Sequence, residues 1–148
     1  MKIIILGAGA VGSTLANLLS QETDLTIVDN DPSKLSKLED EADITTLLGG
    51  ASYPNVLVNA GINNADMVVA VTGSDETNLV SCMISKVLND SVKTIARVRE
   101  ISYLKGKTKE AMESGEIPVD VHISPEQLIT DHIAVSYTHL TLPTRSYV

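Results

Sequence analysis

Three glycines near the N-terminus, Gly7, Gly9 and Gly12, have the G-x-G-x-x-G spacing of loops that bind dinucleotides. In such loops the first glycine permits a tight turn, the second lets a pyrophosphate approach the backbone, and the third lets a helix pack closely. An apolar run precedes the loop and an apolar pattern of helical period follows it, which favours a phosphate site at the helix start over an ordinary turn. The residues expected at this dinucleotide site are Gly7, Ala8, Gly9, Ala10, Val11 and Gly12.

Asp29 is the candidate partner for the ribose of such a ligand. It follows a second apolar run and stands twenty positions after Gly9, where the dinucleotide fingerprint places a carboxylate on the ribose hydroxyls. A carboxylate there repels a 2′-phosphate, so the sequence favours NAD(H) over NADP(H). The alternative is that Asp29 caps the helix that begins at Pro32, although Asp31 is better placed for that role.

These residues need a scaffold, and the rest of the chain predicts one of alternating strands and helices. Apolar runs predict strands at residues 3–6, 25–28, 44–48, 67–71, 92–98 and 119–123. Helical patterns and caps predict helices after the glycine loop, from Pro32, from Pro54, from about Asp75, at residues 105–112 and from about Pro125. The predicted fold is α/β: a Rossmann-like, doubly wound, mainly parallel six-stranded sheet with helices on both faces and strand order 3-2-1-4-5-6.

Two of the predicted helices carry distinct apolar patterns. The helix from Pro32 is expected to bury Leu35, Leu38 and Ala42. The helix from Asp75 has apolar residues at helical spacing, namely Leu79, Val80, Met83, Ile84, Val87 and Leu88.

Ligands of open α/β sheets bind beyond the carboxyl ends of the strands, so the residues that follow each strand are candidates. The small residues 49–52 admit an adenine against the backbone, and Thr72–Gly73 offers a hydroxyl and an open backbone near the second ribose. Arg97 is a permanent cation that can contact phosphate. The alternatives are that Thr72–Gly73 is only a turn and that Arg97 pairs with Glu100 or Asp75.

Composition excludes several classes of function. The 11 basic and 19 acidic residues give a net charge of −8 without a basic stripe, which argues against nucleic-acid binding. No run approaches the roughly 18 apolar residues of a membrane helix, so no direct membrane insertion is expected and the cytoplasm is the expected location. Cys82 is the only cysteine and is expected to be a buried structural thiol. His122, His132 and His139 have no metal-ligand spacing, so neither a metal site nor a catalytic role is assigned.

The C-terminal stretch departs from the pattern of the rest. We expect residues 1–134 to form the domain, with its last helix from about residue 125. Residues 135–148 lose the helical pattern, gain threonines and contain Pro143. They resemble the read-through tails of truncated predicted genes, and the alternative is a flexible C-terminus.

The chain resembles the RCK/KTN N-terminal (TrkA-N) domain family of potassium-transport regulatory proteins from residue 1 to about residue 134. The matching segments are residues 1–9 with 11–12, 65–72, 74–78, 95–99 and 125–128. The resemblance implies NAD(H) binding through residues 7–11, Asp29, Thr72–Gly73 and Arg97, with ATP and ADP as candidate competitors. Gly50 stands where many relatives have an aspartate, and the small ligand-binding lobe that follows in the family is missing.

The resemblance also implies a cytoplasmic regulator, peripheral on the inner face of the cell membrane. Such domains assemble into dimers and rings that dock on a Trk-type membrane potassium transporter and gate it according to the bound nucleotide. The rival hypothesis is an NAD-dependent oxidoreductase or a fragment of one, since one fold hosts both activities. The sequence carries no Tyr-x-x-x-Lys pair on a helix and no substrate domain, so a non-enzymatic role is expected. A purely structural oligomerisation module would leave Asp29 and the glycines without a purpose.

Overall fold

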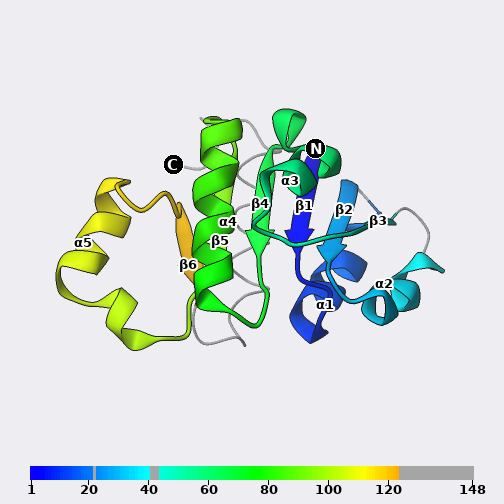
Figure 1. Cartoon of the computed structure of the whole chain (residues 1–148), viewed down its shortest axis with the longest axis horizontal. Coiled ribbons are helices and arrows are strands. Elements are labelled where there is room, and N and C mark those ends of the chain that lie inside the picture. The colour runs from blue at the N-terminus through cyan, green and yellow to red at the C-terminus, as the bar shows by residue number, and fades with distance from the viewer. Residues whose placement is uncertain (22, 41–43, 124–148) are drawn as a thin grey trace, which may run out of the picture.

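The structure, a computed structural model, describes residues 1–21, 23–40 and 44–123 (Figure 1). The strands are β1 (Lys2–Leu6), β2 (Asp24–Asp29), β3 (Ile44–Leu48), β4 (Met67–Ala70), β5 (Lys93–Arg97) and β6 (Val121–Ile123). The helices are α1 (Ala10–Leu19), α2 (Pro32–Glu39), α3 (Pro54–Ala60), α4 (Asp75–Leu88) and α5 (Gly106–Ser114), with short 3-10 helices at η1 (Ile62–Asn64) and η2 (Ile101–Leu104). None of the helices in this described part is long and apolar enough to cross a membrane.

The strands form one sheet in the order β3-β2-β1-β4-β5-β6, and the pairs between neighbours are parallel. This confirms the predicted doubly wound fold. Leu6 of β1 pairs with Val28 of β2 and with Ala70 of β4, and Ala70 pairs with Ala96 of β5. The next residues of these four strands therefore share the carboxyl edge of the sheet. They are Gly7, Asp29, Val71 and Arg97.

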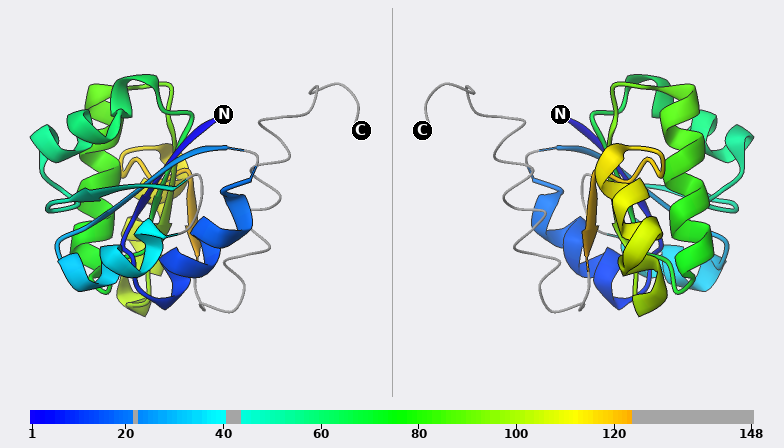
Figure 2. Two further views of the ribbon diagram at one scale, coloured as in Figure 1. Left: turned by 90° about the vertical axis from the view of Figure 1, so that its right-hand side faces the viewer. Right: turned by 90° about the vertical axis from the view of Figure 1, so that its left-hand side faces the viewer.

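Helices cover both faces of the sheet, because successive residues of a strand point to opposite sides. Ile3 and Ile5 pack in the core cluster beneath α1 and α2, whereas Ile4 and Leu6 pack in the cluster beneath α3 and α4. Figure 2 shows α1 and α4 on opposite sides of the sheet, and Figure 1 shows α5 beyond the β6 edge. The core is aliphatic, in keeping with a chain that has no Phe and no Trp.

Local sequence signals explain where the helices begin and end. Asp31 caps α2 by accepting a hydrogen bond from the N–H of Ser33 at 2.9 Å, with Pro32 as the first helical residue. Hydrogen bonds from the hydroxyl and N–H of Ser33 hold the pKa of Asp31 below its ordinary value. Gly61 ends α3 at φ 97°, a left-handed conformation that glycine adopts readily. These boundaries agree with the predicted caps.

The packed face of α4 differs from a simple apolar stripe. Val80, Met83 and Val87 are 40%, 44% and 75% exposed. The buried residues are small or polar, namely Asn78, Ser81, Cys82 and Ser85. Small side chains let the helix lie close to β5, where the thiol of Cys82 contacts the carbonyl oxygen of Ile95 at 3.9 Å. Burial raises the pKa of the Cys82 thiol to about 12, as expected for a structural thiol.

The sixth strand begins later than its apolar run predicts. The expected strand at residues 119–123 is shortened to β6, because Asp120 bonds across to β5 through its side chain: its Oδ2 accepts from the N–H of Thr94 at 2.9 Å.

Leu35 and Leu38 of α2 are buried as predicted. Ala42, the helix from Pro125, the domain boundary at residue 134 and the tail at 135–148 lie outside the described residues.

Candidate nucleotide-binding site

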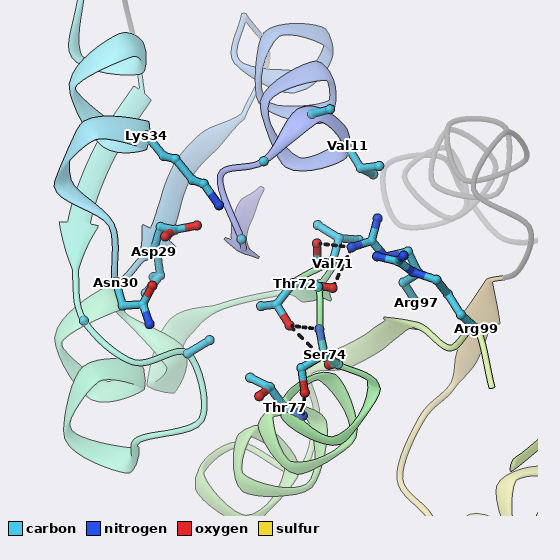
Figure 3. A pocket seen from close by; sticks show the side chains of 17 residues that line it. Val11, Asp29, Asn30, Lys34, Val71, Thr72, Ser74, Thr77, Arg97 and Arg99 are labelled. Carbon is cyan, nitrogen blue, oxygen red and sulfur yellow. Dashed lines mark hydrogen bonds between the residues drawn. The ribbon is translucent and has the colours of Figure 1, made fainter.

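A pocket of about 640 Å³ opens at the carboxyl edge of the sheet, between the ends of β1 and β2 and those of β4 and β5 (Figure 3). Strand order reverses between β1 and β4, and this is where open α/β sheets bind ligands. Eight of the ten predicted site residues line the pocket: Gly7, Gly9, Ala10, Val11, Asp29, Thr72, Gly73 and Arg97. Ala8 and Gly12 do not line it, although both shape the loop that does.

Gly7 and Gly12 are required by the fold itself. Gly7 has φ 111°, and a Cβ on it would lie 3.0 Å from the backbone of Val71 and Thr72. A Cβ on Gly12 would overlap the carbonyl oxygen of Gly7, so α1 can pack against β1 only with glycine at this position. These contacts match the turn and packing roles that the spacing predicts.

Gly9 is different, because nothing in the described structure requires it to be glycine. Its φ of −74° suits any L-residue, and a Cβ on it would meet no atom of the described residues within 4 Å. Gly73, on the opposite side of the pocket, is exposed and likewise has no neighbour within 4 Å of a Cβ. Both positions therefore leave space for an external group to approach the backbone.

The N-terminus of α1 opens into the pocket beside Gly9. Gly9 is the N-cap residue, and none of the side chains that the structure describes caps the helix. The hydroxyls of Ser13 and Thr14 donate instead to the carbonyl oxygens of Ala8 and Ala10, at 3.0 and 2.8 Å. Since the first turn also has no acidic residue, its N–H groups and helix dipole favour an anion.

Asp29 joins the two loops at the β1–β2 side of the pocket. Its Oδ2 accepts from the N–H of Ala8 at 2.8 Å, and its Oδ1 accepts from the N–H of Asp31 at 2.8 Å. Asp31, and not Asp29, caps α2. Each carboxylate oxygen can accept more than one hydrogen bond, so Asp29 can hold these backbone groups and still receive a ligand hydroxyl.

Thr72 turns its hydroxyl into the protein. The hydroxyl donates to Oδ1 of Asn78 at 2.7 Å and accepts from the N–H of Ser74 at 3.2 Å. The sequence suggests a hydroxyl available to a ribose, whereas in the structure this hydroxyl faces acceptors within the protein, Oδ1 of Asn78 at 2.7 Å and the carbonyl oxygen of Ser74 at 3.2 Å. The exposed backbone of Gly73 is the more open group on this side.

Arg97 is only 6% exposed, and its guanidinium hydrogen-bonds the backbone that follows β4. Its Nη2 donates to the carbonyl oxygens of Val71 at 3.1 Å and Thr72 at 2.6 Å. Asp75, one of the two acidic partners considered for it, accepts from the backbone N–H groups of Arg99 and Glu100. The guanidinium therefore shapes the pocket wall while it also lines the cavity.

Several lining residues were missed by the sequence reasoning, above all Lys34 and Arg99. Figure 3 shows Asp29, Asn30 and Lys34 on one side of the cavity and Thr72, Arg97 and Arg99 on the other. Lys34 stands in the first turn of α2, and Arg99 stands two residues after Arg97, so both positions could have been read from their proximity to predicted strand ends. Of the expected adenine segment, Gly49 and Ala51 line the pocket; a Cβ on Gly50 would crowd the ring of Tyr53.

The charge of the pocket is opposite to that of the chain. Among the described residues that line the pocket, three are basic and one, Asp29, is acidic, whereas the whole chain carries a net charge of −8. A concave site that gathers cations attracts anions by its local field. The arrangement suits an elongated anionic ligand that also presents hydroxyl groups.

Comparison with known proteins adds an independent line of evidence. The sequence matches the family model of the TrkA-N domain over residues 3–125. It is 50% identical over 134 residues to the Trk system potassium uptake protein TrkA of Halomonas elongata, and 48% identical over 134 residues to that of Haemophilus influenzae. Both matches cover 90% of this chain and 29% of the relative, so the chain spans about three tenths of the length of these curated relatives.

Solved structures with the same fold are also found. The TrkA-N domain of the inner membrane protein ybaL from Escherichia coli superposes with a TM-score of 0.71 at 17% identity, over 95% of this chain and 96% of that chain. The GsuK channel bound to NAD superposes with a TM-score of 0.67 at 20% identity, over 83% of this chain and 21% of that chain.

Proposed function

Because this chain belongs to the TrkA-N domain family, we propose that it is the nucleotide-binding part of a regulatory subunit of a potassium-uptake transporter. Its ligand is NAD(H), and ATP and ADP compete for the same site. The single observation that carries the proposal is the N-terminus of α1 beside Gly9, where no described side chain caps the helix and no described atom fills the space above the backbone.

The proposed ligand lies across the pocket from Asp29 to Thr72–Gly73. Asp29 binds the hydroxyls of the adenosine ribose, and the loop from Gly7 to Gly12 binds the pyrophosphate. Thr72–Gly73 borders the half of the dinucleotide beyond the pyrophosphate, and Arg97 stabilises phosphate charge. The excess of cations among the lining residues supports an anionic ligand.

The nucleotide acts in this proposal as a signal. A ligand shifts the balance between two arrangements of an assembly only by the difference between its affinities for them. The chain therefore assembles with further copies, docks on a Trk-type membrane subunit at the inner face of the cell membrane, and favours one state of the transporter when NAD(H) is bound. The names of the TrkA relatives and the NAD-bound GsuK structure support this choice.

Isothermal titration of the protein with NADH, NAD⁺, ATP and ADP tests the proposal. We expect saturable binding of at least one of them by the native chain and at least about a tenfold loss in Gly9→Ala. Asp90→Asn, which changes an exposed carboxylate outside the pocket, is the control and should bind as the native chain does. Absence of binding by all four nucleotides would overturn the proposal. Oxidation of NADH that depends on a small substrate would instead support the hypothesis of an NAD-dependent oxidoreductase.

A further inference from the structure

Asn78, in the first turn of α4, has every hydrogen-bonding group of its side chain engaged although it is 0% exposed. Its Oδ1 accepts from the N–H of Thr72 at 3.0 Å and from the hydroxyl of Thr72 at 2.7 Å. Its Nδ2 donates to the carbonyl oxygen of Thr72 at 3.2 Å and to that of Arg97 at 2.9 Å. An amide has two donors and two acceptor lone pairs, so its capacity is used in full.

These bonds tie together three elements that border the pocket. Thr72 follows β4, Arg97 ends β5, and Asn78 belongs to α4. Arg97 closes the group by donating to the carbonyl oxygen of Thr72 at 2.6 Å. Buried polar groups joined in this way fix a single geometry, because any movement leaves a desolvated donor or acceptor without its partner.

Asn78 itself does not line the pocket, whereas Thr72, Gly73 and Arg97 do. It therefore reaches a ligand only through them. We propose that Asn78 is a positioning residue of the nucleotide site, which holds the Thr72–Gly73 turn in the conformation that receives the half of a dinucleotide beyond the pyrophosphate. This inference rests on the proposed function and adds to it the group that shapes the α4 side of the pocket.

The proposal separates two kinds of ligand. Asp29 and Lys34 lie on one side of the pocket, and Thr72 and Arg97 lie on the other (Figure 3). AMP, with one ribose and one phosphate, occupies the Asp29 side and the glycine loop. NADH extends to the Thr72 side, so only NADH depends on the turn that Asn78 holds.

Asn89 at the other end of α4 provides a matched control. Its Nδ2 donates to the carbonyl oxygens of Ile62 at 2.9 Å and Ala65 at 3.1 Å, and its Oδ1 accepts from the N–H of Ser91 at 3.1 Å. Asn89 therefore also links backbone groups of neighbouring segments through its side-chain amide, but it does not line the pocket. Loss of its donor costs stability without touching the Thr72–Gly73 turn.

The experiment compares Asn78→Asp with Asn89→Asp, since each change keeps the side-chain shape and replaces the donating nitrogen with an oxygen. Affinities for NADH and AMP are measured by calorimetry at a temperature at which circular dichroism shows each variant to be folded. We expect Asn78→Asp to weaken NADH binding about tenfold and AMP binding less than about threefold. Asn89→Asp should lower the Tm while leaving both affinities within about twofold of the native values.

Thr72→Val provides a second variant, which removes the 2.7 Å bond to Asn78 from the other partner together with the 3.2 Å bonds between the Thr72 hydroxyl and the backbone of Ser74, and should weaken NADH selectively by about threefold. Equal loss of NADH and AMP affinity in both Asn78→Asp and Thr72→Val, or no loss of either, would overturn the positioning role while the proposed function stands. Failure of the native chain to bind any of NADH, NAD⁺, ATP and ADP would overturn the proposed function and this inference together.

Discussion

The N–H of Ala8 donates to Oδ2 of Asp29 at 2.8 Å, so a residue at the end of β2 fixes the loop that follows β1. The other oxygen of the same carboxylate accepts from the N–H of Asp31 at 2.8 Å. One side chain therefore links the loop after β1 to the loop after β2, and both loops border the pocket. The residue expected to bind the ribose is also the residue that shapes the phosphate loop.

Removal of the Asp29 carboxylate should consequently affect stability as well as binding. Asp29→Ala leaves the partly buried N–H of Ala8 without an acceptor, and we expect the free energy of unfolding to fall by about 2 kcal/mol. Binding of NADH should weaken at least about tenfold. Urea denaturation and calorimetry measure the two effects. Asp90→Ala, at an exposed position, is the control; unchanged stability in Asp29→Ala would contradict the bracing role.

The glycines of the loop should separate by stability. Gly9→Ala adds a methyl group to open space at an ordinary φ, so the free energy of unfolding should change by less than about 1 kcal/mol. Gly12→Ala forces a methyl group onto the carbonyl of Gly7 and should cost about 3 kcal/mol or more. Urea denaturation of both variants at pH 7 is the measurement. Equal destabilisation would mean that the fold, and not a ligand, requires glycine at position 9.

The roles of the three glycines illustrate what the sequence could predict. Their spacing and the flanking strand and helix specify the loop, and the alternation of strands and helices specifies the parallel sheet and its order. Because parallel strands end at one edge, the sequence also predicts which residues meet there. Asp29 and Arg97 are brought together across that edge in this way.

The rest depended on packing that no local pattern carries. Asn78 lies one turn into α4, and neither hydrophobicity nor charge marks it in the sequence. Its importance comes from the carbonyl groups of Thr72, in the turn after β4, and of Arg97, at the end of β5. The apolar residues of α4 suggested its buried face, yet the close approach to β5 selects small residues instead. Hydrophobicity alone cannot predict this, because burial there depends on the distance between helix and sheet.

Asp120 should make the free energy of unfolding depend on pH in the acidic range. Burial raises its pKa, but hydrogen bonds from Lys86 at 2.9 Å and from the N–H of Thr94 at 2.9 Å outweigh burial and hold the pKa below its ordinary value of 3.8. A carboxyl whose pKa is lowered on folding stabilises the folded state above its unfolded pKa, and that stabilisation is lost as the pH falls through the folded pKa. The stabilisation is therefore present at neutral pH and is lost as the pH falls from 3.8 through the lower pKa of the folded state.

The comparison of Asp120→Asn with the native chain tests this. We expect the variant to be less stable at pH 7 by about 1 kcal/mol, and the difference to shrink as the pH falls below 3.8. Urea midpoints measured between pH 7 and pH 2.5 give the profile, and Asp90→Asn serves as the exposed control. A difference that grows toward low pH would contradict the assignment.

Ser85 on the packed face of α4 offers a stabilising substitution. Its hydroxyl is buried and has no hydrogen-bond partner among the residues that the structure describes. Ser85→Ala removes a desolvated polar group and improves helix propensity, so the free energy of unfolding should rise by up to about 1 kcal/mol. Ser85→Leu should instead lower it by at least about 2 kcal/mol, because small residues permit the close approach of α4 to the sheet. Thermal unfolding of both variants is the measurement, and Val87→Ala is the exposed control. A Ser85→Leu variant as stable as the native chain would contradict the close packing of α4 on the sheet.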